Sequence, residues 1–176
     1  LLRWAKKRSR DGQTWKHLAR FAEQDPTYIA DVLAQVKERP LVAADLAEPR
    51  RRSGQWWGGR SLGSLLLDQQ FVAGIGNYLR SEILFISRLN PILRPKDLST
   101  HQKQTLARDI LRITKQAFLT AGVTNDLSRV SQLKEQGFSR SKYRFAVFAR
   151  AGLPCYECGA KVVRSESNGR RLYSCL

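Results

Sequence analysis

The sequence has no methionine, only three cysteines and two histidines in 176 residues, and no long apolar run. Without methionine, Leu1 is not expected to be a natural translation start, so we interpret the chain as a piece of a longer protein. Three cysteines argue against a disulfide framework and favour a reducing, cytoplasmic setting. No run is long enough to span a bilayer, and the opening LLRW turns basic too soon for a signal peptide.

Acidic residues are also scarce, because 15 Asp and Glu face 31 Lys and Arg, which gives a net charge of +16. Such a surplus favours a polyanionic partner, with nucleic acid first and an anionic membrane surface second. A soluble basic protein without such a partner is the plain alternative. The apolar fraction of 42% is enough for a buried core and argues against wholesale disorder. Neither the histidines nor Asp68 belong to a Ser/His/Asp or paired-carboxylate arrangement that would indicate catalysis.

Residues 1–60 form one compositional block. Asp25-Pro26 has the signature of a helix start, and Pro40 ends that helix. Arginines, tryptophans and glycines then crowd residues 50–59, which indicates a basic, aromatic loop. Short helices followed by such a loop suggest a winged-helix segment.

Apolar residues at helical spacing predict three helices after this block. Two are expected at about 61–72 and 78–87, on either side of a Gly-Ile-Gly break. The third is longer, is capped at the Ser99-Thr100 pair and ends at Gly122. Residues 122–142 are polar and are expected to be flexible.

The glycine break is the first candidate site. Gly74 and Gly76 permit a tight turn that a Cβ would obstruct, and Asn77 follows at the start of a helix. Free N–H groups and the positive end of the helix dipole meet there, which suits a phosphate. Asn77 would add a side-chain donor. The alternative is that Asn77 only caps its helix, which is the usual role of Asn at that place.

The cysteines are the second candidate site. Cys155 and Cys158 form a C-x2-C knuckle, and Cys175 follows after sixteen residues that carry a hairpin signal around Asn168-Gly169. Two knuckles joined by a hairpin make a four-thiolate zinc ribbon, of which three ligands are present in this chain. The alternative is three free or buried thiols.

Arginines surround both sites. Arg170 and Arg171 follow the hairpin turn, from which an arginine can reach phosphates or a minor groove. The alternative is a solvated surface arginine. Further basic residues are expected to make generic backbone contacts or to face solvent; they are Arg80, Arg88, Arg94, Lys96, Arg140, Lys142 and Arg144.

Three motifs together resemble the C-terminal half of the formamidopyrimidine-DNA glycosylase and endonuclease VIII family, with the endonuclease VIII branch nearest. They are LLLDQQFVAGIGNYLRSEIL at 65–84, YRFAVFARAGLPCYECG at 143–159 and GRRLYSC at 169–175. The family pattern is a helix–two-turn–helix module followed by a C-x2-C-x16-C-x2-C zinc ribbon. This chain reproduces that spacing as far as its third cysteine.

The resemblance implies base-excision repair of oxidised bases in DNA. Asn77 matches the family asparagine that holds phosphates beside the flipped lesion, and Arg170 matches the arginine of the zinc hairpin. The three cysteines match zinc ligands. Residues 122–142 correspond to the part where the family carries a loop near the extruded base.

Other family features have no match in these residues. The family nucleophile is an N-terminal proline amine followed by a glutamate, on a β-sandwich domain, and the fourth zinc ligand is also missing. Residues 1–60 are instead similar to a winged-helix region of a bacterial glycosylase family that unhooks DNA crosslinks, through LLRW, DPTYIADVLAQVKERPLVAADL and GQWWG. That similarity predicts a fusion or chimaera with a boundary near residues 58–61.

The expected protein is therefore mainly α-helical. A possible winged-helix segment at 1–60 precedes a helix–two-turn–helix DNA-binding domain at 61–148 and a truncated β-hairpin zinc ribbon at 149–176. The function expected is the damaged-DNA-binding half of an endonuclease VIII-type DNA glycosylase and AP lyase, and the alternative is a non-catalytic DNA-binding module. A third interpretation, an RNA-associated zinc-ribbon protein, fits the charge and the ribbon but not the glycine turn. We expect a bacterial, nucleoid-associated monomer that binds double-stranded DNA with oxidised-base or abasic sites, binds Zn2+ and does not bind membranes.

Overall fold

The computed structural model describes residues 59–69, 71–72 and 74–175. The winged-helix segment predicted for residues 1–60 therefore lies almost wholly outside the described residues. The described part is mainly helical and carries one two-stranded antiparallel sheet, as the sequence predicts. No helix in this part is long and apolar enough to cross a membrane. Its elements are α5 (Leu62–Leu65), α6 (Asn77–Ile86), the 3-10 turn η1 (Pro95–Asp97), α7 (Thr100–Leu119), α8 (Leu127–Glu135), α9 (Arg140–Tyr143), β1 (Val163–Ser167) and β2 (Arg170–Ser174).

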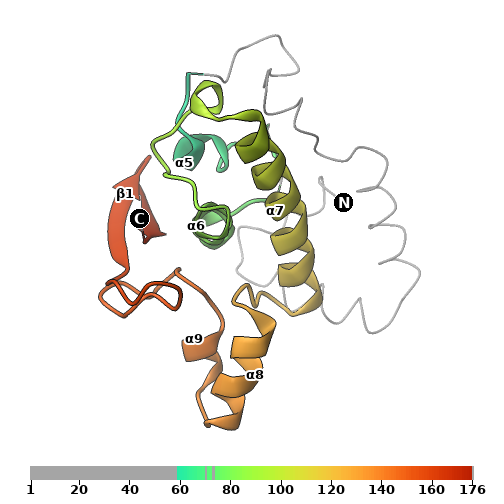
Figure 1. Ribbon diagram of the computed structural model, residues 1–176, viewed down its shortest axis with the longest axis vertical. Coiled ribbons are helices and arrows are strands. Elements are labelled where there is room, and N and C mark those ends of the chain that lie inside the picture. The colour runs from blue at the N-terminus through green and yellow to red at the C-terminus, as the bar shows by residue number, and fades with distance from the viewer. Residues whose placement is uncertain (1–58, 70, 73, 176) are drawn as a thin grey trace, which may run out of the picture. The chain divides into compact units, whose positions relative to one another are not determined.

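Helix α6 lies at the centre of these elements, with α7 on one side and the β1–β2 hairpin on the other (Figure 1). Its buried face carries Leu79, Ile83 and Leu84. Opposite them, α7 buries an apolar stripe at the i, i+4, i+7 spacing of an amphipathic helix, and that stripe includes Leu106 and Ile113. Because α6 packs on both sides, polar residues on it are drawn into the interior.

Helix α7 begins and ends close to its predicted bounds. Ser99 is the N-cap and forms a capping box with Gln102. At the other end Gly122 donates to the Ala117 carbonyl at 2.6 Å, and both Ala121 and Gly122 have positive φ in this closing turn, at 54° and 95°. The predicted end at Gly122 is therefore close, and the turn places a glycine where positive φ costs little.

The helix predicted at 61–72 is wrong in length. Only α5 forms, with Ser61 as its N-cap, and irregular turns follow it. The Gln69 amide bonds three backbone groups here, at Leu67, Gly74 and Ile75. Because those bonds satisfy the backbone of a turn, the chain leaves the helix before the glycines rather than at them.

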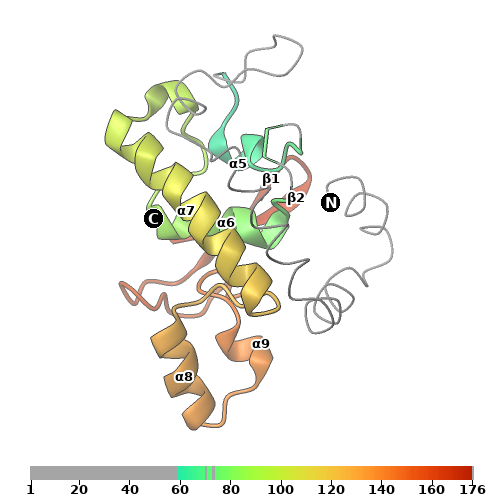
Figure 2. The ribbon, with the colours of Figure 1, turned by 90° about the vertical axis from the view of Figure 1, so that its right-hand side faces the viewer.

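Residues 122–142, which the sequence predicts to be flexible, contain two helices. Helices α8 and α9 form there and lie side by side in both views (Figures 1 and 2). Asp126 caps α8 by accepting from the Arg129 N–H at 2.9 Å, and Val130 is its buried residue. The Asp126 cap and the burial of Val130 both stabilise α8, whose apolar residues Leu127, Val130 and Leu133 recur at helical spacing.

The predicted hairpin is confirmed. Strands β1 and β2 pair from Val163↔Ser174 to Ser167↔Arg170. Asn168 and Gly169 join them with φ of 54° and 66°, as a two-residue turn with positive φ at both positions requires. The open end of the hairpin therefore adjoins the cysteines, and its turn end lies near α5 (Figure 2).

Candidate nucleic-acid interface and metal centre

The glycine turn delivers the chain to the start of α6. Gly74 has φ of +92°, a conformation that favours glycine. Gly76 is the N-cap residue and, as a glycine, makes no side-chain capping hydrogen bond. The N–H groups of the first turn of a helix have no partner within the helix, and they lie at the positive end of its dipole.

Asn77 is the first residue of α6 and does not cap it. Its side-chain Oδ1 accepts a hydrogen bond from Arg80 Nη2 at 2.7 Å. With the oxygen so assigned, the amide Nδ2 remains as a donor at the helix start. The capping alternative is thus excluded, whereas a phosphate contact of Asn77 stays a prediction.

Arg80 differs from the sequence-based expectation for basic residues. It neither faces solvent nor is placed to make a generic contact with a nucleic-acid backbone. Its side chain is 0% exposed, one turn after Asn77 on the face of α6 that meets the hairpin. Nη1 donates to the Gly63 carbonyl at 2.9 Å, and Nη2 donates to the Arg171 carbonyl at 3.0 Å. Arg80 therefore joins α5, α6 and β2.

Arg170 begins β2, directly after the hairpin turn, and is exposed. Its carbonyl accepts from Arg80 Nη2 at 3.4 Å, the same nitrogen that bonds Asn77. Two of the residues predicted from separate motifs, Asn77 and Arg170, are thus brought together through Arg80. Arg171, the next residue, is also exposed.

Two other basic residues, Arg144 and Arg88, differ in their surroundings. Arg144 packs against the Tyr78 and Phe145 rings, and its Nε donates to the Gly122 carbonyl at 2.8 Å, so it is structural. Arg88 is exposed at the end of α6, with φ of 52°. Arg144 therefore stabilises the fold, whereas Arg88 adds positive potential at the surface.

The three cysteines lie together, as their spacing predicts. The Sγ atoms of Cys155, Cys158 and Cys175 all lie within 4.8 Å of one another, and those of Cys158 and Cys175 are 3.3 Å apart. Tetrahedral zinc with thiolate bonds of about 2.3 Å requires sulfur separations of about 3.8 Å. The Glu157 N–H also donates to Cys155 Sγ at 3.4 Å. Both the geometry and the soft donor set fit a zinc ion.

The pKa values of Cys155 and Cys175 are shifted in opposite directions. Burial raises the pKa of Cys155, but hydrogen bonds from the Glu157 and Cys158 N–H groups and from the other thiols outweigh burial and lower it below its usual value. The hydrogen bond with Cys158, together with burial, raises the pKa of Cys175 to about 12. A divalent cation would instead take all three as thiolates, because metal binding displaces protons.

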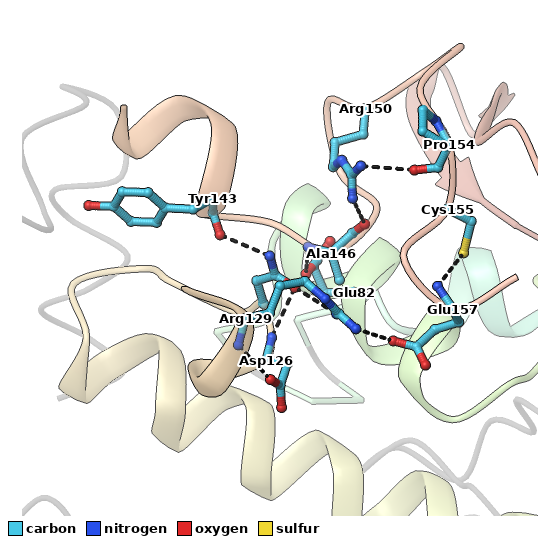
Figure 3. Close-up of polar contacts among 10 residues, drawn as sticks. Glu82, Asp126, Arg129, Tyr143, Ala146, Arg150, Pro154, Cys155 and Glu157 are labelled. Atoms are coloured by element: carbon cyan, nitrogen blue, oxygen red, sulfur yellow. Dashed lines mark hydrogen bonds and ion pairs between the residues drawn. The ribbon is translucent and has the colours of Figure 1, made fainter. Parts of the chain in front are cut away.

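Glu82 holds the segment that leads into the knuckle. Its side chain is 0% exposed and accepts four hydrogen bonds. Three come from the N–H groups of Ala146, Val147 and Phe148, at 2.8 to 2.9 Å, and one comes from Thr124 Oγ1 at 2.7 Å. Figure 3 shows Glu82 beside Ala146. Burial raises the pKa of Glu82, and these donors oppose the rise. A single carboxylate of α6 thus fixes residues 146–148 in place.

Two arginines fasten the knuckle itself (Figure 3). Arg150 donates to the Pro154 carbonyl at 2.9 Å and lies 3.3 Å from the centre of the Tyr156 ring. Arg129 of α8 stacks on the same ring at 4.7 Å and pairs with Glu157 at 2.9 Å. The knuckle is therefore attached to α8 through side chains as well as through the chain.

Sequence reasoning missed the roles of Gln69, Arg80 and Glu82. All three lie in the motif at 65–84, but an arginine or glutamate on a helix ordinarily faces solvent. One usable signal was that Arg80 and Glu82 lie next to Leu79 and Ile83 in a helix that is rich in apolar residues. Their partners cannot be read from that signal.

The sequence of this chain is similar to those of known proteins. Residues 45–128 match the family described as the formamidopyrimidine-DNA glycosylase H2TH domain. The chain is 38% identical to endonuclease 8 of Escherichia coli O17:K52:H18 (strain UMN026 / ExPEC) over 151 residues, which cover 86% of this chain and 48% of that protein. The chain spans about half the length of the curated relatives it matches.

Solved structures of similar fold are found in the same group of proteins. MutM (Fpg) of Thermus thermophilus has a TM-score of 0.54 and 31% identity, over 66% of this chain and 44% of that chain. Lactococcus lactis Fpg (MutM), solved with DNA that contains N7-benzyl-Fapy-dG, has a TM-score of 0.53 and 25% identity, over 66% and 41%.

These matches also extend into residues 1–60. Both the H2TH match and the 151-residue match begin before residue 61. The separate origin proposed for residues 1–60, and the domain boundaries at 61–148 and 149–176, stay predictions. Residues 45–128 are thus similar to the formamidopyrimidine-DNA glycosylase H2TH domain, and most of this chain is similar to about half of endonuclease 8.

Proposed function

We propose that this chain binds double-stranded DNA at oxidised-base or abasic sites, as the DNA-gripping half of an endonuclease 8-type DNA glycosylase and AP lyase. The observation that carries the proposal is the junction of Asn77 and Arg170 at the open start of α6. An amide donor, the N–H groups of the first turn of α6 and an exposed arginine whose backbone is joined to them through Arg80 suit a backbone phosphate. The DNA-bound Lactococcus Fpg structure supports the same assignment.

A phosphate-based grip predicts strong salt dependence. We expect the affinity for a duplex with one abasic-site analogue to fall by at least about tenfold between about 50 and about 200 mM salt, because phosphate contacts release counterions. Titration by fluorescence anisotropy at several salt concentrations measures this. A structured RNA of equal length is the control and should bind more weakly. Affinity that is independent of salt would contradict the proposal.

We further propose that Cys155, Cys158 and Cys175 bind Zn2+, with a fourth ligand from outside the described residues. Bound zinc would supply structural cross-linking, and the three thiolates would be its ligands from the described residues. At free zinc about one hundred times its Kd, the free energy of unfolding should rise by about 2.7 kcal/mol.

The zinc prediction is tested by denaturant unfolding with and without a chelator. Cys158→Ser should abolish the zinc-dependent difference, and the exposed control Ser165→Ala should keep it. Substitution with Co2+ should give thiolate-to-cobalt absorption in the wild-type chain. Unfolding curves that coincide with and without zinc would sink this part of the proposal.

Strand cleavage distinguishes the glycosylase and AP lyase from the non-catalytic binding module. Borohydride trapping on a duplex with one abasic site reports an amine of this chain that attacks C1′. A covalent adduct would establish lyase chemistry in the chain itself. Tight binding without an adduct would favour a binding module whose catalytic amine lies elsewhere.

A further inference from the structure

We propose that Arg80 is a positioning residue: it fixes the turn end of the β1–β2 hairpin against α6 and thereby sets where Arg170 lies relative to Asn77. The proposal rests on the proposed DNA-binding function. In this proposal Arg80, which is buried, sets the spacing between two surface residues that bind phosphate, Asn77 and Arg170.

The contacts of Arg80 span the whole junction. Besides Gly63, Asn77 and Arg171, its guanidinium reaches the carbonyls of Ser167 and Arg170, each at 3.4 Å. Ser167 ends β1 and Arg170 begins β2, so one planar group holds both sides of the hairpin turn. Only arginine has a rigid fork that can bond several acceptors in different directions.

The partners of Arg80 are all neutral. They are four carbonyls and one amide oxygen, and no hydrogen-bonded or ion-paired carboxylate is found for this side chain among the described residues. Burial, and next to it the charge of Arg170, lower the pKa of Arg80 to about 10. A buried cation without a counter-ion is costly to keep, so its retention needs a reason other than ion pairing. A phosphate at the start of α6 would lie beside this uncompensated charge.

Neighbouring contacts fix the same end of the hairpin. Asn168 Nδ2 donates to Ser64 Oγ at 2.6 Å, which docks the turn on α5. Ser167 Oγ is also next to α5, because a Cβ on Gly63 would lie in van der Waals contact with it, at 3.5 Å.

The cysteines lie at the opposite, open end of the hairpin, where Val163 pairs with Ser174. Arg80 and the metal site therefore hold different ends. It follows that loss of the Arg80 fork should displace Arg170 even when the three thiolates are intact, and that zinc content should not change.

The test is a double-mutant cycle in the full chain. Arg80→Met and Arg170→Ala should each weaken binding to an abasic-site duplex by about tenfold, and the double variant should bind no more weakly than Arg170→Ala alone, because coupled residues are not additive. Arg80→Lys keeps the charge without the fork and should restore only part of the affinity. Arg88→Met, an exposed basic control, should bind nearly as wild type. Independent, additive losses, or wild-type binding by Arg80→Met, would overturn the proposal.

A second readout needs no DNA. Amide hydrogen exchange of residues 170–173 should be faster in both Arg80→Met and Arg80→Lys than in the wild type, while exchange in α7 stays unchanged. If wild-type protein fails to bind DNA, the proposed function fails, but this exchange result still decides the role of Arg80. Unchanged exchange in β2, or an equal rise in β2 and α7 in both variants, would make Arg80 an ordinary core residue and refute the proposal.

Discussion

Replacing Glu82 with leucine is expected to lower the free energy of unfolding by about 3 to 5 kcal/mol. The carboxylate is the common acceptor for the N–H groups of Ala146, Val147 and Phe148 and for the Thr124 hydroxyl. Leucine would leave these buried donors without a partner, and each unpaired donor costs about 1 to 3 kcal/mol, less whatever water recovers. Urea unfolding followed by circular dichroism measures the change.

Glu82→Gln separates charge from shape in this experiment. Glutamine keeps one acceptor oxygen but turns an NH2 group toward donors, so it should lie between the wild type and the leucine variant. Glu135→Gln is the matched control, because Glu135 is an exposed acid at the end of α8, and its effect should be within about 0.5 kcal/mol. A loss below about 1 kcal/mol for Glu82→Leu would mean that residues 146–148 find other acceptors.

Asn77→Asp is expected to weaken binding to an abasic-site duplex by about tenfold to a hundredfold while leaving the fold intact. Aspartate keeps an oxygen for Arg80 Nη2, which lies 2.7 Å from Oδ1 in the wild type. It loses the Nδ2 donor and adds a negative charge where a phosphate would bind. Fluorescence anisotropy gives the affinity, and thermal unfolding of the same samples gives the stability.

Two further variants make the Asn77 result specific. Asn77→Ala removes both the donor and the acceptor for Arg80, so it should lose affinity and some stability together. Arg88→Ala removes an exposed cation from the other end of α6 and should lose less affinity than either Asn77 variant. Equal losses for Asn77→Asp and Arg88→Ala would show that Asn77 contributes nothing beyond general electrostatics.

The sequence by itself determined the local features. A two-residue turn that needs positive φ selects Asn168-Gly169, and the strands on either side follow from it. Capping chemistry placed the start of α7 at Ser99, and the C-x2-C spacing brought Cys155 and Cys158 together. Each of these signals acts over a few residues, which is why a sequence pattern can carry it.

The tertiary structure alone determined which polar residues are buried and which distant segments they join. Arg80 and Glu82 read as ordinary helix polar residues, and they are buried because α6 packs on both sides and their acceptors and donors come from segments far away in the chain. Helix α8 packs on α9 and buries Val130, and neither contact can be read from the sequence of a segment that is mostly polar. Hydrogen bonds between distant segments leave no periodicity or spacing in the sequence, so the junction of Asn77 with Arg170 is a property of the fold.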